Sequence, residues 1–127
     1  SDLDNLYETM HTNYYAWVSG FSAMAMANPD RPQLAQNFAG TLSAIRPDIA
    51  LSVSRAIFQS DNRSELQKVT VPVLLLQTRQ DIAVPREAAE HLHSNIPGSQ
   101  LVIVDAEGHF PHMSAPVEII NAIKTFL

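Results

Sequence analysis

Two side chains of this sequence have the types and spacing of a catalytic acid and base, Asp81 and His109. Asp81 lies in QTRQDIAVP (residues 77–85), directly after an apolar run, and His109 lies in DAEGHFPH (residues 105–112), directly after a second apolar run. An Asp that accepts from one imidazole nitrogen sets the tautomer, so that the other nitrogen can take a proton from a serine. The pair therefore predicts nucleophilic catalysis through an activated serine.

A simpler interpretation exists for each residue alone. An Asp after a strand is usually a turn former, and a Gly-His pair in a loop is usually exposed to solvent. The combined pattern is more specific, because several features occur together in a fixed order along the chain. They are a strand, the motif x-x-x-D-x-x-V-P, a helix, a second strand and the motif x-G-H-x-P-H. We therefore assign Asp81 and His109 jointly as catalytic residues.

The elements that must position this pair are two strands of a parallel sheet. Residues 73–76 and 101–104 are apolar runs typical of strands, and a helix is expected between them, from Pro85 to Pro97. A second helix is predicted from Pro116 to Leu127. Strands joined through a helix run parallel, so both loops lie at the carboxyl edge of the sheet, where open α/β sheets carry their sites.

A parallel sheet formed only by the two predicted strands, residues 73–76 and 101–104, is incomplete. The first run is continuously apolar, which is typical of a strand buried on both faces. Because two parallel strands cannot bury both faces or satisfy both edges, we expect the rest of the sheet to lie upstream of this chain.

The region before residue 69 has helical periodicity. Prolines in NPDRP (residues 28–32) and RPD (residues 46–48) divide it into helices, and a short segment, residues 64–68, follows. The chain is therefore divided into a helical part, residues 1–68, and a strand-containing part, residues 69–127. The apolar positions that define the helices are spaced by three or four: Tyr14, Trp17, Phe21, Met24; Leu34, Phe38, Leu42, Ile45; Ile49, Val53, Ile57.

A nucleophile is missing from the pattern. The serine of a nucleophile elbow stands between glycines, G-x-S-x-G, on a turn from strand to helix, and no such stretch occurs. Ser52, Ser54 and Ser60 follow no strand and are interpreted as polar groups of a helix or its end. We expect this chain to be catalytically inactive by itself.

Composition excludes several other classes of function. With eight basic residues scattered among thirteen acidic ones, the chain is not expected to bind nucleic acid. The absence of cysteine excludes disulfides, thiolate zinc sites and cysteine nucleophiles. No apolar run reaches the roughly 20 residues of a membrane span, and no signal peptide is recognisable, so a cytoplasmic protein is expected.

A metal site or cofactor is not expected. His91 and His93 are two positions apart on a predicted helix and point to different faces, whereas helical metal pairs are spaced by three or four. His112 is interpreted as structural.

Four stretches carry a resemblance to a known family: NYYAWVSGF (13–21), RPDIALSVSRAIFQSD (46–61), VTVPVLLLQTRQDIAVP (69–85) and EGHFPHMSAP (107–116). The chain resembles the C-terminal part of the bacterial sigma-B stress-regulator hydrolases and of the related plant karrikin and strigolactone receptor hydrolases. NPDRP is closer to the bacterial branch, which we favour, and residues 46–61 are closer to the plant branch. The implied fold class is α/β: the C-terminal portion of an α/β-hydrolase, with a four-helix cap followed by a strand-helix-strand-helix unit.

The resemblance implies a pocket beneath the cap and a serine in an N-terminal part. By position, five residues correspond to the pocket wall, and the alternative for each is an ordinary helix core: Trp17, Phe21, Ile57, Phe58 and Phe110. The implied ligand is a small apolar ester or lactone. A complementary N-terminal half, or self-association through the open first strand, is expected as a partner.

Three functions remain open from the sequence. The first is a serine esterase in which Asp81 orients His109. The second is a small-molecule receptor of hydrolase fold, with slow or incidental hydrolysis and a protein signalling partner. The third is a free-standing interaction module, which is disfavoured because its first strand would be left exposed.

Overall fold

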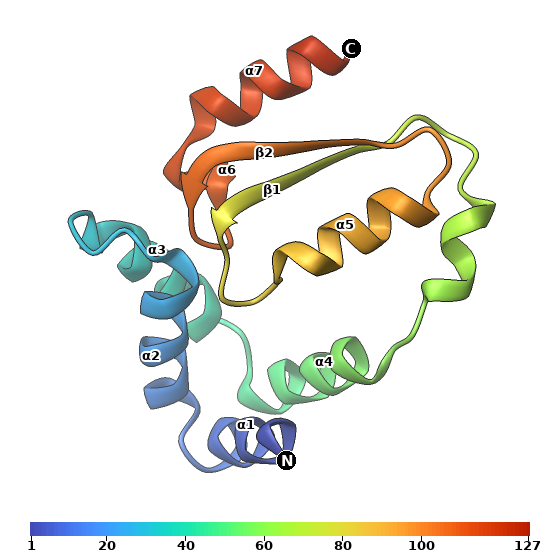
Figure 1. The fold of residues 1–127 in the computed structure, drawn as a ribbon. Helices are drawn as coiled ribbons and strands as arrows, with labels where there is room; N and C mark the ends of the chain where they lie inside the picture. Colours follow the sequence, from blue (N-terminus) through green and yellow to red (C-terminus); the bar gives the residue numbers. More distant parts are fainter.

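Helices precede and surround a pair of strands in the computed structural model, which describes residues 1–127. Four helices form one group at the N-terminal end, and the strands with their helices form a second (Figure 1). The elements are α1 (Asp2–Thr12), α2 (Tyr14–Met26), α3 (Pro32–Ser43), α4 (Pro47–Gln59), the 3₁₀ helix η1 (Arg63–Lys68), β1 (Leu74–Gln80), α5 (Arg86–Asn95), β2 (Gln100–Glu107), α6 (Pro111–Ser114) and α7 (Pro116–Phe126).

The starts of the first four helices follow from local sequence. The Ser1 hydroxyl accepts from the backbone N–H of Asp4, and the Asp4 carboxylate accepts from Ser1 in return, which forms a capping box for α1. The Asn13 side chain caps α2 by accepting from Ala16. Helices α3 and α4 have proline at their first position, where its missing N–H has no intrahelical partner to lose.

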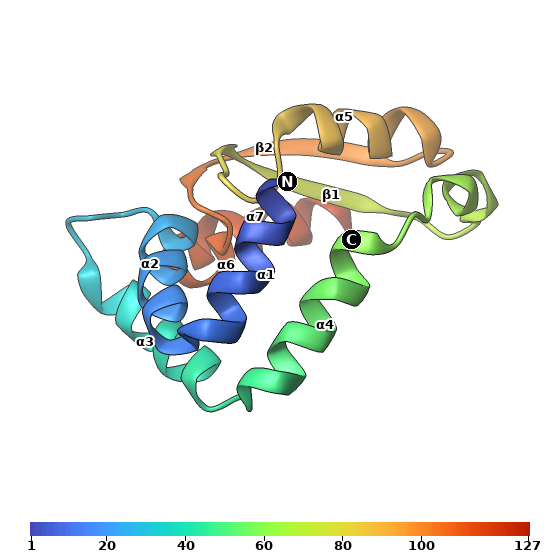
Figure 2. The ribbon, with the colours of Figure 1, turned by 90° about the horizontal axis from the view of Figure 1, so that it is seen from below.

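A small core joins the four helices. It consists of Met10, Tyr14 and Val18, and the Tyr14 hydroxyl donates to the carbonyl oxygen of Leu42 on α3 at 2.8 Å. Helix α1 lies between α2 and α4 and contacts both (Figure 2). The predicted helices after residue 13 are confirmed. Helix α1 was not identified from the sequence, although Leu3, Leu6, Tyr7 and Met10 have the spacing of an amphipathic helix.

The two strands are parallel neighbours, as predicted. Their register runs from Leu74 opposite Gln100 to Gln80 opposite Glu107, with one irregularity between Thr78 and Gln80. Both strands continue beyond the apolar runs that predicted them. The added residues are polar apart from Ala106, and backbone pairing between the strands holds them. The four-residue helix α6 was also not predicted.

Helices α5 and α7 lie on opposite sides of the strands (Figure 1). Ala89 of α5 and Ile96, the residue directly after this helix, are buried, which confirms the predicted inward face. Residues 74–76 of β1 are only half-buried, so the expected burial of both faces is not reached within this chain, because the sheet has two strands.

Apolar surface stays uncovered on two helices. Only 16 of 127 residues are buried, which is few for a chain with this hydrophobic content. The exposed residues follow the predicted helical stripes: Ile49, Val53, Ile57 and Phe58 on α4, and Val117, Ile120 and Ile123 on α7. These stripes are therefore present but lack a packing partner within the chain. No helix has the length and apolar character required to cross a membrane.

Candidate active site

Asp81 lies one residue beyond β1, at the carboxyl end of the strand. One carboxylate oxygen, Oδ1, accepts from the backbone N–H groups of Ala83 and Val84 at 2.8 and 3.1 Å. The other, Oδ2, lies 2.8 Å from Nδ1 of His109. The side chain of Asp81 is only 7% exposed. The carboxylate is therefore largely enclosed, and these three hydrogen bonds hold it in place.

These contacts determine the charge state of Asp81. Burial by itself raises the pKa of the carboxyl group, because it disfavours the charged form. The hydrogen bonds from His109 and from the Val84 and Ala83 N–H groups oppose burial, and the pKa of Asp81 lies below its ordinary value. Asp81 is therefore ionised at neutral pH and acts only as an acceptor.

An ionised acceptor at Asp81 sets the tautomer of His109. Nδ1 must carry the proton that is donated to Asp81, and Nε2 then has a free lone pair. Nε2 has no hydrogen-bond partner within the chain, and the His109 side chain is 31% exposed. The imidazole is thus oriented on one side and open on the other, which is the arrangement that a general base requires.

The backbone before His109 is held tightly between β1 and α2. Gly108 donates to the Gln80 carbonyl at 2.8 Å and accepts from the Thr78 hydroxyl at 2.9 Å. Its φ of 90° is rare for residues with a side chain, and a Cβ atom there would collide with the Met26 carbonyl oxygen. Glycine is therefore required at this point by both conformation and space.

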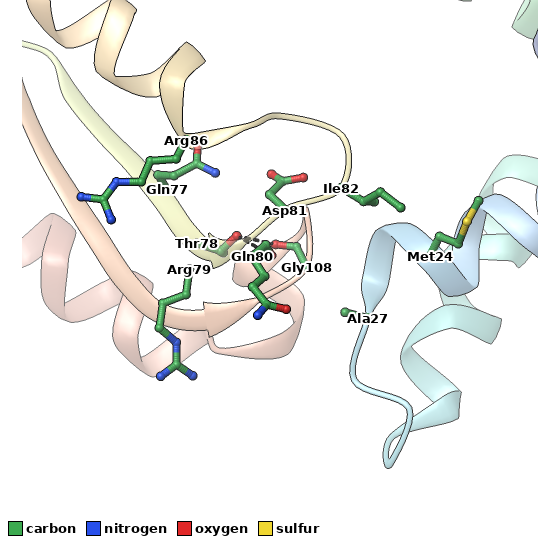
Figure 3. A pocket seen from close by; sticks show the side chains of 10 residues that line it. All are labelled: Met24, Ala27, Gln77, Thr78, Arg79, Gln80, Asp81, Ile82, Arg86 and Gly108. Carbon is green, nitrogen blue, oxygen red and sulfur yellow. Dashed lines mark hydrogen bonds between the residues drawn. The ribbon is translucent and has the colours of Figure 1, made fainter. Parts of the chain in front are cut away.

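Two clefts flank the acid–base pair. One, of about 430 Å³, lies between the end of β1 and the end of α2; Figure 3 shows Met24 and Ala27 facing Ile82 and Asp81 across it. The other, of about 210 Å³, includes both Asp81 and His109. Its apolar lining comes from β1, α5 and their loops: Leu75, Leu76, Val84, Ala89 and Leu92.

A row of aromatic rings leads from α2 to the histidine. Trp17 stacks on Phe21 with ring centres 5.1 Å apart, and Phe21 lies 6.2 Å from Phe38 of α3. Phe38 lies 4.4 Å from Phe110, whose ring meets His109 edge-on at 4.8 Å. The structure thus brings together three of the five residues assigned to the pocket wall and adds Phe38, which the sequence marked only by helical periodicity.

The other two pocket candidates lie elsewhere. Ile57 and Phe58 are on α4, where they are 61% and 52% exposed, and neither joins the aromatic row. Their role in a pocket wall stays a prediction. His112 lies edge-on to Phe110 at 5.9 Å.

No serine occupies the open side of His109. Ser52 and Ser54 lie on α4, and the Ser60 hydroxyl donates to Ile57 at the end of that helix. Sequence reasoning did not identify Thr78, because a polar residue inside a strand belongs to no motif. Its hydroxyl donates to Gly108 and so holds the histidine loop, residues 108–110 between β2 and α6. The pair can accept a proton at His109 Nε2 and return it.

Comparison with known proteins identifies related sequences. Residues 54–127 match the family model described as TAP-like protein, a member of the α/β-hydrolases. The chain is 46% identical to a probable esterase of Oryza sativa subsp. japonica, over 96% of this chain and 45% of that protein. It is 39% identical to a strigolactone esterase of Arabidopsis thaliana, over 99% of this chain and 47% of that protein.

Solved structures agree in fold. A hydrolase from Oleispira antarctica superposes with a TM-score of 0.92 at 30% identity, over 98% of this chain and 46% of that one. The chain spans about half the length of the curated relatives it matches. The fold class expected from the sequence, the C-terminal portion of an α/β-hydrolase, is confirmed.

Proposed function

We propose that Asp81 and His109 are the acid and the base of a serine hydrolase, on the premise that this chain belongs to the α/β-hydrolase family. The observation that carries the proposal is the 2.8 Å contact between Asp81 Oδ2 and His109 Nδ1, with Nε2 left unpaired. In this family's motif order the acid precedes the base and the nucleophilic serine precedes both.

In the proposed reaction, Nε2 of His109 takes the proton of the serine hydroxyl as the oxygen attacks an ester carbonyl. His109 then returns the proton to the leaving alcohol, and water hydrolyses the acyl-enzyme by the same route. Asp81 holds the imidazole and stabilises the imidazolium that forms, without being protonated itself.

The substrate proposed is a small, largely apolar ester or lactone. The aromatic row and the apolar lining beside the pair support it, because apolar walls with a few polar groups are typical of small-molecule sites. We propose that Trp17, Phe21 and Phe110 form part of the wall and that the helical part acts as a lid.

The serine is proposed to come from an N-terminal half, which also supplies the remaining strands. The uncovered stripes of α4 and α7 and the half-buried strand β1 support this, because they offer apolar surface for a complementary structure to cover. We call this chain together with that half the complete protein.

Turnover of nitrophenyl acetate by the complete protein tests the proposal. His109→Ala is expected to reduce kcat by about 10⁴-fold or more, because the serine loses its base. His91→Ala, at an exposed position on α5, is the matched control and should retain full activity. Equal turnover by the wild type and His109→Ala would refute the assignment.

A second candidate is a small-molecule receptor. It is favoured by one finding: the chain is 45% identical, over 96% of its length, to a protein of Petunia hybrida named as a karrikin insensitive 2 receptor. A receptor would bind its ligand beneath the helices, hydrolyse it slowly and engage a protein partner. A ligand-induced rise in melting temperature without product would favour the receptor, and rapid turnover without a partner would favour the esterase.

A further inference from the structure

The turn between α2 and α3, residues 27–31, contacts the chain on both sides of His109. We propose that Asn28 and Arg31 of this turn are positioning residues, which hold the histidine loop in register with α2 and so maintain the Asp81–His109 geometry. This inference rests on the proposed function for its catalytic consequence, whereas the contacts that carry it are independent of that function.

The backbone of this turn has an unusual conformation. Ala27 has φ 51° and ψ −143°, and Asn28 has φ 54°, so two successive residues with side chains lie in the region that favours glycine. Asn tolerates such a conformation better than most residues, but alanine does not. A conformation of this kind persists only where surrounding contacts hold it, and it is found most often at functional sites.

Asn28 supplies the contact before the histidine. Its side-chain amide donates to the Met26 carbonyl at 2.9 Å and to the Glu107 carbonyl at 3.2 Å. Beside it, the backbone N–H of His109 donates to the Ala25 carbonyl at 2.7 Å. The last turn of α2 is thereby tied to Glu107 and His109, on either side of the closely packed Gly108.

Arg31 supplies the contact after the histidine. One guanidinium nitrogen, Nη1, donates to the Ser114 carbonyl at 2.8 Å, and the other, Nη2, donates to the Asn28 side-chain oxygen at 2.5 Å. Ser114 ends the short helix that follows His109. The two side chains therefore form one connected unit that holds positions 107 and 114, with the histidine between them.

This unit links the base to the helix that carries the aromatic row. Helix α2 bears Trp17 and Phe21, and its C-terminal end is the part tied to the histidine loop. On the opposite side, Thr78 and Gln80 hold the same loop to β1, beside Asp81. A shift of α2 relative to the strands would therefore move His109 relative to Asp81 unless these contacts broke.

Two variants in the complete protein separate positioning from folding. Asn28→Gly removes the side-chain contacts while keeping a residue that accepts φ 54°, so it adds no backbone strain. Arg31→Lys keeps the charge but replaces the two-pronged guanidinium with one ammonium group, which cannot reproduce both contacts. Asp30→Asn, at an exposed position of the same turn, is the control.

The measurements are steady-state kinetics with nitrophenyl acetate and the downfield NMR signal of the His109 Nδ1 proton. For Asn28→Gly and Arg31→Lys we expect kcat to fall on the order of tenfold, with KM nearly unchanged, because a small displacement of a catalytic group slows chemistry more than binding. The downfield signal should shift or broaden by exchange in both variants and stay unchanged in Asp30→Asn.

Two outcomes would overturn the inference. In the first, both variants lower the melting temperature but keep the wild-type kcat and the wild-type His109 signal, which indicates a purely structural role. In the second, the wild type lacks esterase activity and both variants leave the His109 signal unchanged, so that the inference and the proposed function fail together. An inactive wild type whose signal shifts in the variants would refute the proposed function alone and support the positioning role.

Discussion

Replacement of Asp81 by Asn is the most direct probe of the acid–base pair, because it changes charge with little change in shape. The oxygen of the new side-chain amide can still accept from the N–H groups of Ala83 and Val84, which leaves the NH₂ group facing Nδ1 of His109. Two donors would then face each other, unless the imidazole changes tautomer. In the other tautomer Nε2 carries the proton and can no longer accept one from serine.

The magnitude follows from this change of tautomer. A loss of about 10⁴-fold in kcat is expected, equivalent to about 5.4 kcal/mol in the activation barrier. The effect on folding should be much smaller, about 1–2 kcal/mol in the free energy of unfolding, because one charge-assisted hydrogen bond is weakened at a site where His109 is partly exposed.

Nitrophenyl acetate turnover by the complete protein measures the first quantity and urea denaturation the second. Asp105→Asn is the matched control, since this carboxylate lies near the end of β2 but pairs with Arg79 at the surface. It should leave turnover unchanged. Turnover by folded Asp81→Asn within about twofold of the wild type would refute the role assigned to the carboxylate.

Three further changes test the surrounding structure. Gly108→Ala should lower the free energy of unfolding by at least about 2 kcal/mol in urea titrations, since its Cβ would collide with a carbonyl of α2 at a strained φ. The pKa of Asp81 lies below its ordinary value, so its contribution to stability should be present above the ordinary carboxyl pKa of about 4 and be lost as pH falls through the lower folded-state pKa. Wild type should therefore lose more stability than Asp81→Asn as pH falls below about 4. Tyr14→Phe should cost about 1 kcal/mol by removing the hydrogen bond to Leu42, whereas Tyr15→Phe, at an exposed ring, should cost nothing measurable.

Much of the secondary structure could be predicted from local patterns. Proline at the first positions of α3, α4 and α7 and apolar spacing along α2 to α4 identified these helices, because capping and periodicity depend on neighbouring residues alone. Helix α1 and the polar ends of both strands were missed. Helix α1 does carry a local signal, because its capping box and the spacing of Leu3, Leu6, Tyr7 and Met10 are typical of a helix. The strand ends are held by backbone pairing with a distant segment, which leaves little trace in the local sequence.

The prediction of the site divides in the same way. The proximity of Asp81 and His109 could be predicted because each follows an apolar run, and parallel strands bring the loops at their carboxyl ends together. Asn28 and Arg31 were noticed only as part of a proline-containing loop. Their contacts with Glu107 and Ser114 span 79 and 83 positions of sequence, and no local pattern encodes them.

The sequence by itself was enough to predict that Asp81 and His109 lie close together beyond the ends of two parallel strands, since residue type, spacing and strand topology suffice for this. Only the tertiary structure decided which nitrogen of His109 is free, because that depends on the contact with Asp81. It also decided that α2 closes over Gly108 and that Phe38 joins the aromatic row. These relations arise from the packing of the helical part against the strands, where residues far apart in the chain meet.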